Sequence, residues 1–184
     1  MSARTDYLGP ALRIVGVPLG IAALMLRPVG TPAAVGIVAL VGVIGLLTPT
    51  SKSADVVPVR WLAVTGLGLA AFVVARVLVQ AVPAPSHTWA IAGATVAAVS
   101  EEAFFRRLVY GWLASSYSGL LAVLVSAACF ALVHVPAYGF ISLPLNLAAG
   151  LLFGWQRWAS GTWTASAVTH VAANFLQMGG VFIL

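Results

Sequence analysis

The sequence predicts an all-α fold, a single polytopic membrane domain of about seven transmembrane helices over residues 1–184. Hydrophobic residues make up 61% of the chain and charged residues only 7%, whereas a soluble domain typically carries about a quarter charged residues. A chain this poor in charge cannot build an ordinary water-exposed surface, and its hydrophobicity excludes intrinsic disorder. The second observation is a series of apolar segments, each with the length of a membrane span.

These segments follow one another along the whole chain, each close to the 20 or so residues that cross the hydrocarbon as a helix. We place them at approximately residues 8–26, 29–48, 61–82, 88–113, 119–135, 141–159 and 163–184. The first ends at Arg27-Pro28, and the next three end at runs rich in Pro, Ser or Gly at 48–52, 83–87 and 115–119. All six tryptophans lie within about one turn of a segment end, as in an interfacial aromatic belt. A signal peptide is the alternative for the first segment, but no small-residue cleavage site follows it.

The basic residues predict the orientation of the bundle. The net charge is +5, and its cations are too dispersed to bind nucleic acid. With seven spans, the side of the N-terminus holds Arg4, Lys52, Arg60, Arg107 and Arg157, whereas the other side has only Arg27 in its loops. The positive-inside rule then places the N-terminus in the cytoplasm and the C-terminus outside the cell membrane.

The fourth segment carries four charged residues in the run from Glu101 to Arg107. Each charge at a helix centre costs about 2.5–3.5 kcal/mol, so such charges face protein or water and mark function. Glu102 and Arg106 have the i, i+4 spacing of a helical ion pair. Glu101 points about 100° away and has Phe105 at its i+4 position. We therefore expect Glu102 to be structural and Glu101 to be available for chemistry. A cytoplasmic loop is the alternative, which the flanking apolar runs 88–99 and 108–113 disfavour.

Two further polar patterns lie in the fifth and seventh segments. Phe130 and His134 share a helix face, as do His170 and Asn174. Counted from the cytoplasmic ends of their spans at 1.5 Å per residue, Glu101 and His134 lie at depths of about 21 and 22 Å, and His170 and Asn174 at about 12 and 18 Å. A lone histidine in a helix is usually a packing residue. Four polar groups at similar depth, however, predict one site near mid-membrane.

The chemistry that these groups support is hydrolysis. A carboxylate beside an imidazole can activate a water, with one group taking its proton. A second imidazole and an amide can donate hydrogen bonds to a developing oxyanion. A carboxylate with two imidazoles is also a common catalytic zinc set, with a position left open for water. The residues alone leave both mechanisms open.

Three motifs, taken together and in order, resemble the CPBP family of type II CAAX prenyl endopeptidases and their bacterial relatives. They are Glu-Glu-x-x-x-Arg at 101–106, Phe-x-x-x-His at 130–134 and His-x-x-x-Asn at 170–174. The resemblance covers about residues 88–178 and divides the domain into three N-terminal spans (1–87) and a four-span catalytic core (88–184). It implies an intramembrane endopeptidase in which Glu101 and His134 activate water and His170 and Asn174 stabilise the oxyanion. Glu102, Arg106 and Phe130 would then be supporting residues.

The resemblance implies a membrane-associated protein or peptide as substrate. We favour a mechanism that requires no cofactor, because Asn174 is a poor metal ligand and a good hydrogen-bond donor. The alternative is zinc held by Glu101, His134 and His170, with Glu102 as general base. Two other functions stay open: a non-proteolytic scaffold, immunity or regulatory protein, and a small transporter. The transporter is disfavoured because the sequence has no inverted repeat.

Overall fold

The computed structural model describes residues 5–50, 56–79 and 88–178, and over these residues the chain is helical and contains no strand. The predicted all-α class is confirmed for this part of the chain. The elements are α1 (Thr5–Leu26), α2 (Pro32–Leu47), α3 (Pro58–Val79), α4 (Thr88–Glu102), the π-helical η1 (Ala103–Val109), α5 (Tyr110–Ala114), α6 (Gly119–Leu132), α7 (Val135–Tyr138), the 3₁₀-helical η2 (Phe140–Ser142), α8 (Leu143–Ser160) and α9 (Thr164–Met178).

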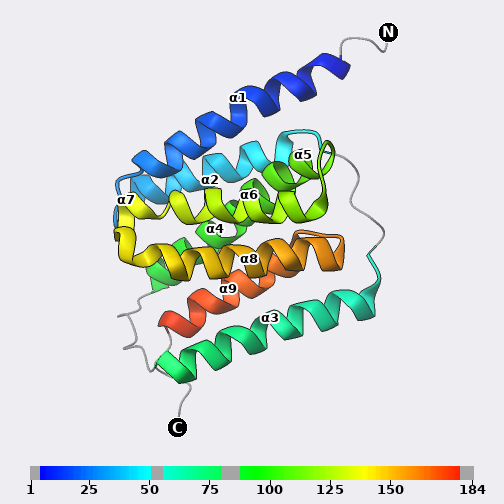
Figure 1. Ribbon diagram of the computed structural model, residues 1–184. Helices are drawn as coiled ribbons and strands as arrows, with labels where there is room; N and C mark the ends of the chain where they lie inside the picture. Colours follow the sequence, from blue (N-terminus) through cyan, green and yellow to red (C-terminus); the bar gives the residue numbers. More distant parts are fainter. Residues whose placement is uncertain (1–4, 51–55, 80–87, 179–184) are drawn as a thin grey trace.

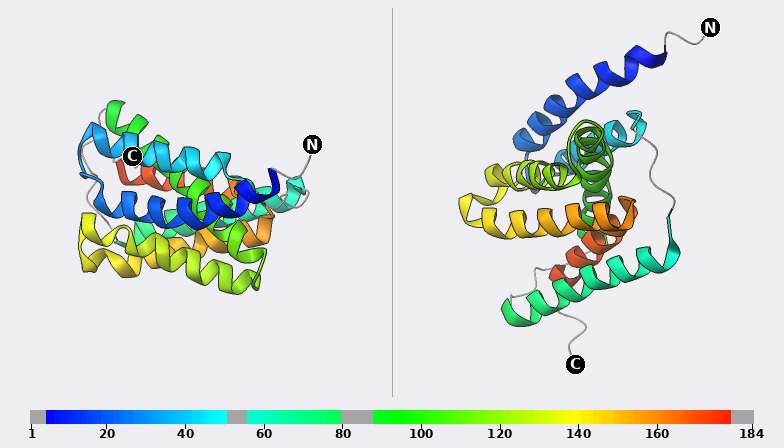
Figure 2. Two further views of the ribbon diagram at one scale, coloured as in Figure 1. Left: turned by 90° about the horizontal axis from the view of Figure 1, so that it is seen from above. Right: turned by 45° about the vertical axis from the view of Figure 1, so that its right-hand side comes forward.

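The helices form a layered bundle in which α1 and α3 lie at opposite edges (Figure 1). The same order is visible in the turned view on the right of Figure 2. Between the edges, α6 packs on α8, α2 packs on α4, and α9 packs on both α4 and α3. The helices that carry the three motifs are therefore neighbours in the middle of the bundle.

Each of the seven predicted segments overlaps a helix, although residues 80–82 and 179–184 lie outside the described part of the chain. Two helical stretches, Pro58–Leu78 and Gly119–Tyr138, are long and apolar enough to cross a membrane. The apolar parts of the first two helices, Pro10–Leu26 and Pro32–Leu47, are shorter. The number of spans therefore stays a prediction.

Burial of polar and apolar side chains is reversed relative to a soluble protein. Glu102 and Arg106 are 0% exposed, whereas Ile141 is 91% and Leu26 is 83% exposed. Soluble proteins almost never bury a charged side chain completely unless it is paired, and a large exposed apolar surface marks an interaction site. This distribution is what a lipid environment favours.

The fifth predicted segment is not one continuous helix, contrary to expectation. The α6 helix ends at Leu132, Val133 and His134 form a turn, and α7 begins at Val135. Pro136 explains the interruption, because proline lacks the N–H that would bond the carbonyl four residues earlier and its ring clashes with that carbonyl. His134 thus lies at a helix junction, where its side chain has more room than it would have within a helix.

The fourth segment is continuous, but its charged part is π-helical. The η1 turn begins directly after Glu102 and carries Arg106 and Arg107. Such π-helical turns are rare and occur frequently at functional sites. Arg107 was expected in a cytoplasmic loop. It is instead half-buried and donates hydrogen bonds to the carbonyls of Gly45 and Thr48, where a cation stabilises the C-terminal end of α2.

Glycines let α2 approach the motif-bearing helix closely. A Cβ atom added at Gly42 would lie 2.5 Å from the Ser100 side chain, and one at Gly45 would lie 2.6 Å from the Ala103 carbonyl. Larger residues at these positions would push α2 away from Ser100 and the two glutamates. This close packing brings the α1–α2 loop alongside Glu101.

Candidate active site

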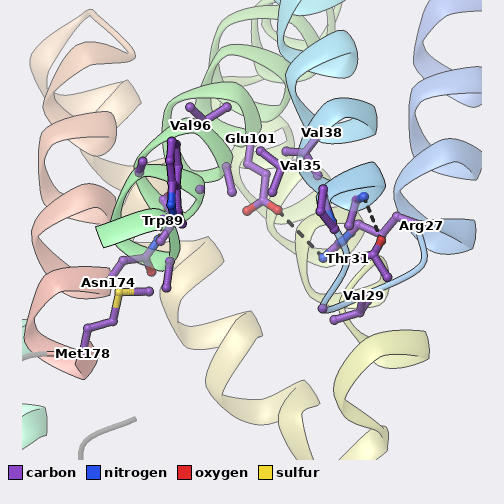
Figure 3. Close-up of a pocket in the computed structure, with 18 of the residues that line it drawn as sticks. Arg27, Val29, Thr31, Val35, Val38, Trp89, Val96, Glu101, Asn174 and Met178 are labelled. Carbon is purple, nitrogen blue, oxygen red and sulfur yellow. Dashed lines mark hydrogen bonds and ion pairs between the residues drawn. The ribbon is translucent and has the colours of Figure 1, made fainter. Parts of the chain in front are cut away.

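Glu101 lies in a cavity of about 930 Å³ enclosed by the α1–α2 loop, α2, α4 and α9. Its side chain is only 6% exposed. Figure 3 shows its carboxylate in this cavity, with Asn174 of α9 on one side and Arg27 on the other. The predicted availability of Glu101 therefore has a geometric basis, since its carboxylate lines an internal cavity within the bundle.

His134 faces Glu101 across a gap that is longer than a direct hydrogen bond. Its Nε2 lies 3.7 Å from Glu101 Oε2, and its Nδ1 lies 2.7 Å from the carbonyl oxygen of Phe130. A carbonyl oxygen can only accept, so Nδ1 carries the proton and donates. In the neutral ring Nε2 is then an acceptor, and two acceptors face each other at 3.7 Å.

Glu102 is held by two direct contacts. Its Oε1 lies 3.3 Å from Nη1 of Arg106 and 3.1 Å from Nδ1 of His170. The pairing with Arg106 predicted from the i, i+4 spacing is present. The contact with His170 was not expected, because His170 was assigned to the oxyanion together with Asn174. Since the carboxylate accepts, His170 Nδ1 donates to it.

Asn174 lies one turn beyond His170 on α9. Its Nδ2 donates a hydrogen bond to the Ala94 carbonyl of α4 at 3.2 Å, which leaves its second N–H for another acceptor. Both residues line the 930 Å³ cavity, and together with His134 they also line a neighbouring cavity of about 420 Å³. The structure thus brings Glu101, His134, His170 and Asn174 together around one space.

Phe130 connects the two histidines to Arg106. The guanidinium carbon lies 4.5 Å from the centre of the Phe130 ring, within the range of a cation–π contact. The same ring lies 4.6 Å from the His134 ring and 5.8 Å from the His170 ring, centre to centre. An aromatic residue four positions before His134 therefore supports Arg106 and both imidazoles.

Three residues near the site were missing from the expected set. Arg27 was expected in a loop on the outer side, but it is 7% exposed and its Nη2 lies 3.9 Å from Glu101 Oε1. Tyr138 stacks on His134 with ring centres 6.0 Å apart, and Phe153 stacks on His170 at 4.8 Å. None of these contacts corresponds to a short-range spacing, so no pattern within one helix could have identified them.

The zinc alternative was tested against the arrangement of the candidate ligands. Among the residues that the structure describes, no group of three His, Cys, Asp or Glu side chains is placed to hold a metal ion. Glu101, His134 and His170 therefore do not form the expected ligand set. His170 is instead turned toward Glu102 through Nδ1.

Comparison with known families gives one match. Residues 83–176 match the family model described as type II CAAX prenyl endopeptidase Rce1-like. Comparisons with curated proteins and with solved structures find no match. The matched region covers just over half of the chain and includes all three motifs. The chain therefore belongs to the Rce1-like family of type II CAAX prenyl endopeptidases.

Proposed function

We propose that this protein is an intramembrane endopeptidase that hydrolyses a peptide bond of a membrane-associated protein or peptide. Membership of the Rce1-like family implies peptidase activity of the CAAX-protease type. The observation that carries the mechanism is the pair of acceptors, Glu101 Oε2 and His134 Nε2, facing each other at 3.7 Å. A water molecule relieves this arrangement, because it can donate one hydrogen to each acceptor.

A water held in this way is ready to attack a carbonyl carbon. Its two hydrogens are directed at Glu101 and His134, so its lone pairs are free for the substrate. As the oxygen–carbon bond forms, the proton passes to Glu101, and the substrate carbonyl becomes an oxyanion. When the intermediate collapses, the carbon–nitrogen bond breaks and the same proton passes to the leaving amine.

The oxyanion is proposed to be stabilised from α9. Asn174 has one N–H that is not donated to Ala94, and an amide donor of this kind suits a developing negative charge. His170 already donates through Nδ1. Donation from its Nε2 as well requires the doubly protonated ring, which the Glu102 carboxylate would stabilise. Asn174 is thus the simpler donor, and His170 contributes when it is protonated.

We propose that the whole chain is one membrane domain of seven spans in the plasma membrane, with a cytoplasmic N-terminus and an external C-terminus. The family is membrane-embedded, and the exposed apolar surface of the helices supports a multi-pass arrangement. The three N-terminal helices support the catalytic core of residues 88–184. The proposed reaction uses water activated by Glu101 and His134 and requires no metal.

A comparison of membrane proteomes tests this function. A deletion strain is complemented with the wild-type protein or with Glu101→Gln, and new protein termini are identified by mass spectrometry. We expect termini that appear with the wild type and are absent with Glu101→Gln. If no terminus depends on Glu101 while the variant keeps the cellular effect, the protein acts as a non-proteolytic scaffold or regulator.

A further inference from the structure

Arg27 is a buried arginine at the end of α1, far in sequence from the three motifs and outside the matched region. Its Nη1 donates a hydrogen bond of 2.7 Å to the Leu24 carbonyl. Its Nη2 lies 3.9 Å from Glu101 Oε1, as the dashed line in Figure 3 marks. The guanidinium fork therefore has one arm fixed on α1 and the other directed at the proposed base.

This arrangement fixes the Glu101 carboxylate from the side opposite His134. Oε1 faces Arg27 and Oε2 faces His134, at 3.9 and 3.7 Å. The hydrogen bond to Leu24 restrains the Arg27 side chain, and a planar guanidinium loses little further freedom when it binds a carboxylate. A cation at this distance also favours the ionised carboxylate.

We propose that Arg27 is a positioning residue that keeps Glu101 ionised and turned toward His134. The inference rests on the proposed function of Glu101 as the base. It assigns a role in the site to the N-terminal half of the chain, beyond the region that carries the family motifs.

The other groups around Glu101 do not replace this cation. Arg106 on the same helix is paired with Glu102. His170 on α9 is also bonded to Glu102, and His134 faces Glu101 through an unprotonated nitrogen in its neutral form. The packed helix α2 has no titratable residue. Removing the Arg27 charge should therefore let Glu101 take up a proton at higher pH, by about one pH unit or more.

The test measures protonation of Glu101 directly and needs no substrate. An apolar carbodiimide reacts with protonated carboxyl groups, and the 930 Å³ cavity gives it access to Glu101. The purified full-length protein in detergent is labelled across a pH series, and modification at residue 101 is quantified by fragment mass spectrometry. The variants are Arg27→Gln and Arg27→Met, two neutral residues of different polarity so that one folded variant suffices, and Arg27→Lys. Arg13→Gln is the matched control, because Arg13 also lies on α1 and also bonds a backbone carbonyl, that of Pro49.

We expect the labelling midpoint to rise by about one pH unit in the neutral variants, which is about a tenfold increase in labelling at pH values above the midpoint. The midpoint should stay near that of the wild type in Arg27→Lys and Arg13→Gln. An unchanged midpoint in a folded Arg27→Gln or Arg27→Met protein overturns the inference.

Cleavage of a quenched prenylated CAAX peptide, measured on the same samples, separates this inference from the proposed function. If the peptide is cleaved, the acid limb of its pH–rate profile should move with the labelling midpoint, and Arg27→Lys should restore the limb. A shifted midpoint without cleavage by the wild type contradicts the proposed function and leaves the Arg27–Glu101 interaction standing.

Discussion

Glu101 and Glu102 are neighbours in the chain, and each has its own arginine and its own histidine. Glu102 contacts Arg106 and His170 directly, at 3.3 and 3.1 Å, and is 0% exposed. Glu101 faces Arg27 and His134 at 3.9 and 3.7 Å and lines the large cavity. The two sets have the same chemical composition and differ in spacing and in access to the cavity.

The difference teaches how one pair of glutamates can serve two purposes. Direct contacts in a fully buried place leave no room for water, so the Glu102 set ties α9 to η1. Longer distances beside a cavity leave Glu101 and His134 able to hold a water between them. Four predictions test this division, beginning with the largest expected effect.

Breaking the Glu102 set should cost the most stability. Arg106→Met removes the cation from a completely buried pair and leaves the carboxylate without it, a change that typically costs about 3–5 kcal/mol. The measurement is the free energy of unfolding in detergent, by chemical denaturation. Arg13→Met, a less buried arginine on α1, should change that free energy by about 0.5 kcal/mol or less. Equal effects of the two substitutions would contradict a structural role for the pair.

Removing the imidazole from the Glu101 set should reduce activity with little loss of stability. His134→Gln deprives the water of one of its two acceptors, and a general acid or base contributes about 10²–10⁴-fold to a rate. We expect kcat for a quenched prenylated CAAX peptide to fall by about 10²-fold or more. A variant with normal cleavage would show that His134 does not hold the attacking water.

Loss of the proposed oxyanion donor should have an effect of similar or smaller size. Asn174→Ala removes the free N–H, and one such donor is worth about 10²–10³-fold in kcat. It also removes the hydrogen bond to Ala94, so the unfolding midpoint is measured alongside. Gln177→Ala, one turn further along α9, is the control and should keep kcat. If both substitutions lower kcat equally, the effect belongs to the helix and the oxyanion assignment fails.

Removal of metal ions should have no effect on activity. Neither glutamate set gathers three ligands in the part of the chain that the structure describes. The purified enzyme is treated exhaustively with a chelator, its zinc content is measured by elemental analysis, and cleavage is compared before and after. Stoichiometric zinc whose removal abolishes cleavage, and whose return restores it, would replace the proposed mechanism by a metal-dependent one.

The sequence alone was sufficient for features that depend on local spacing. Apolar length located the helices, and the i, i+4 rule found the Glu102–Arg106 pair. Depth along each span brought His134 to Glu101. It also placed His170 nearer the cytoplasmic side than Glu101, in agreement with its contact to Glu102. These features need only the helical rise and repeat.

Features that depend on how helices pack were beyond prediction. The Arg27–Glu101 contact exists because glycines let α2 lie close to α4, which no single segment reveals. Which glutamate faces α9 depends on the rotation of α4, and the π-helical turn after it has no recognisable pattern. The interruption at His134 had a visible cause in Pro136, which was overlooked because the apolar run continues through it.

The most direct test of the division compares Glu101→Gln with Glu102→Gln in one lipid nanodisc preparation. Both substitutions are isosteric and remove one negative charge, so they differ only in which set they affect. We predict that Glu101→Gln loses cleavage by about 10²-fold or more while unfolding close to the wild-type midpoint. Glu102→Gln should show the larger loss of stability. A stable Glu102→Gln protein without cleavage, beside a Glu101→Gln protein that cleaves normally, would reverse the two roles and contradict the account.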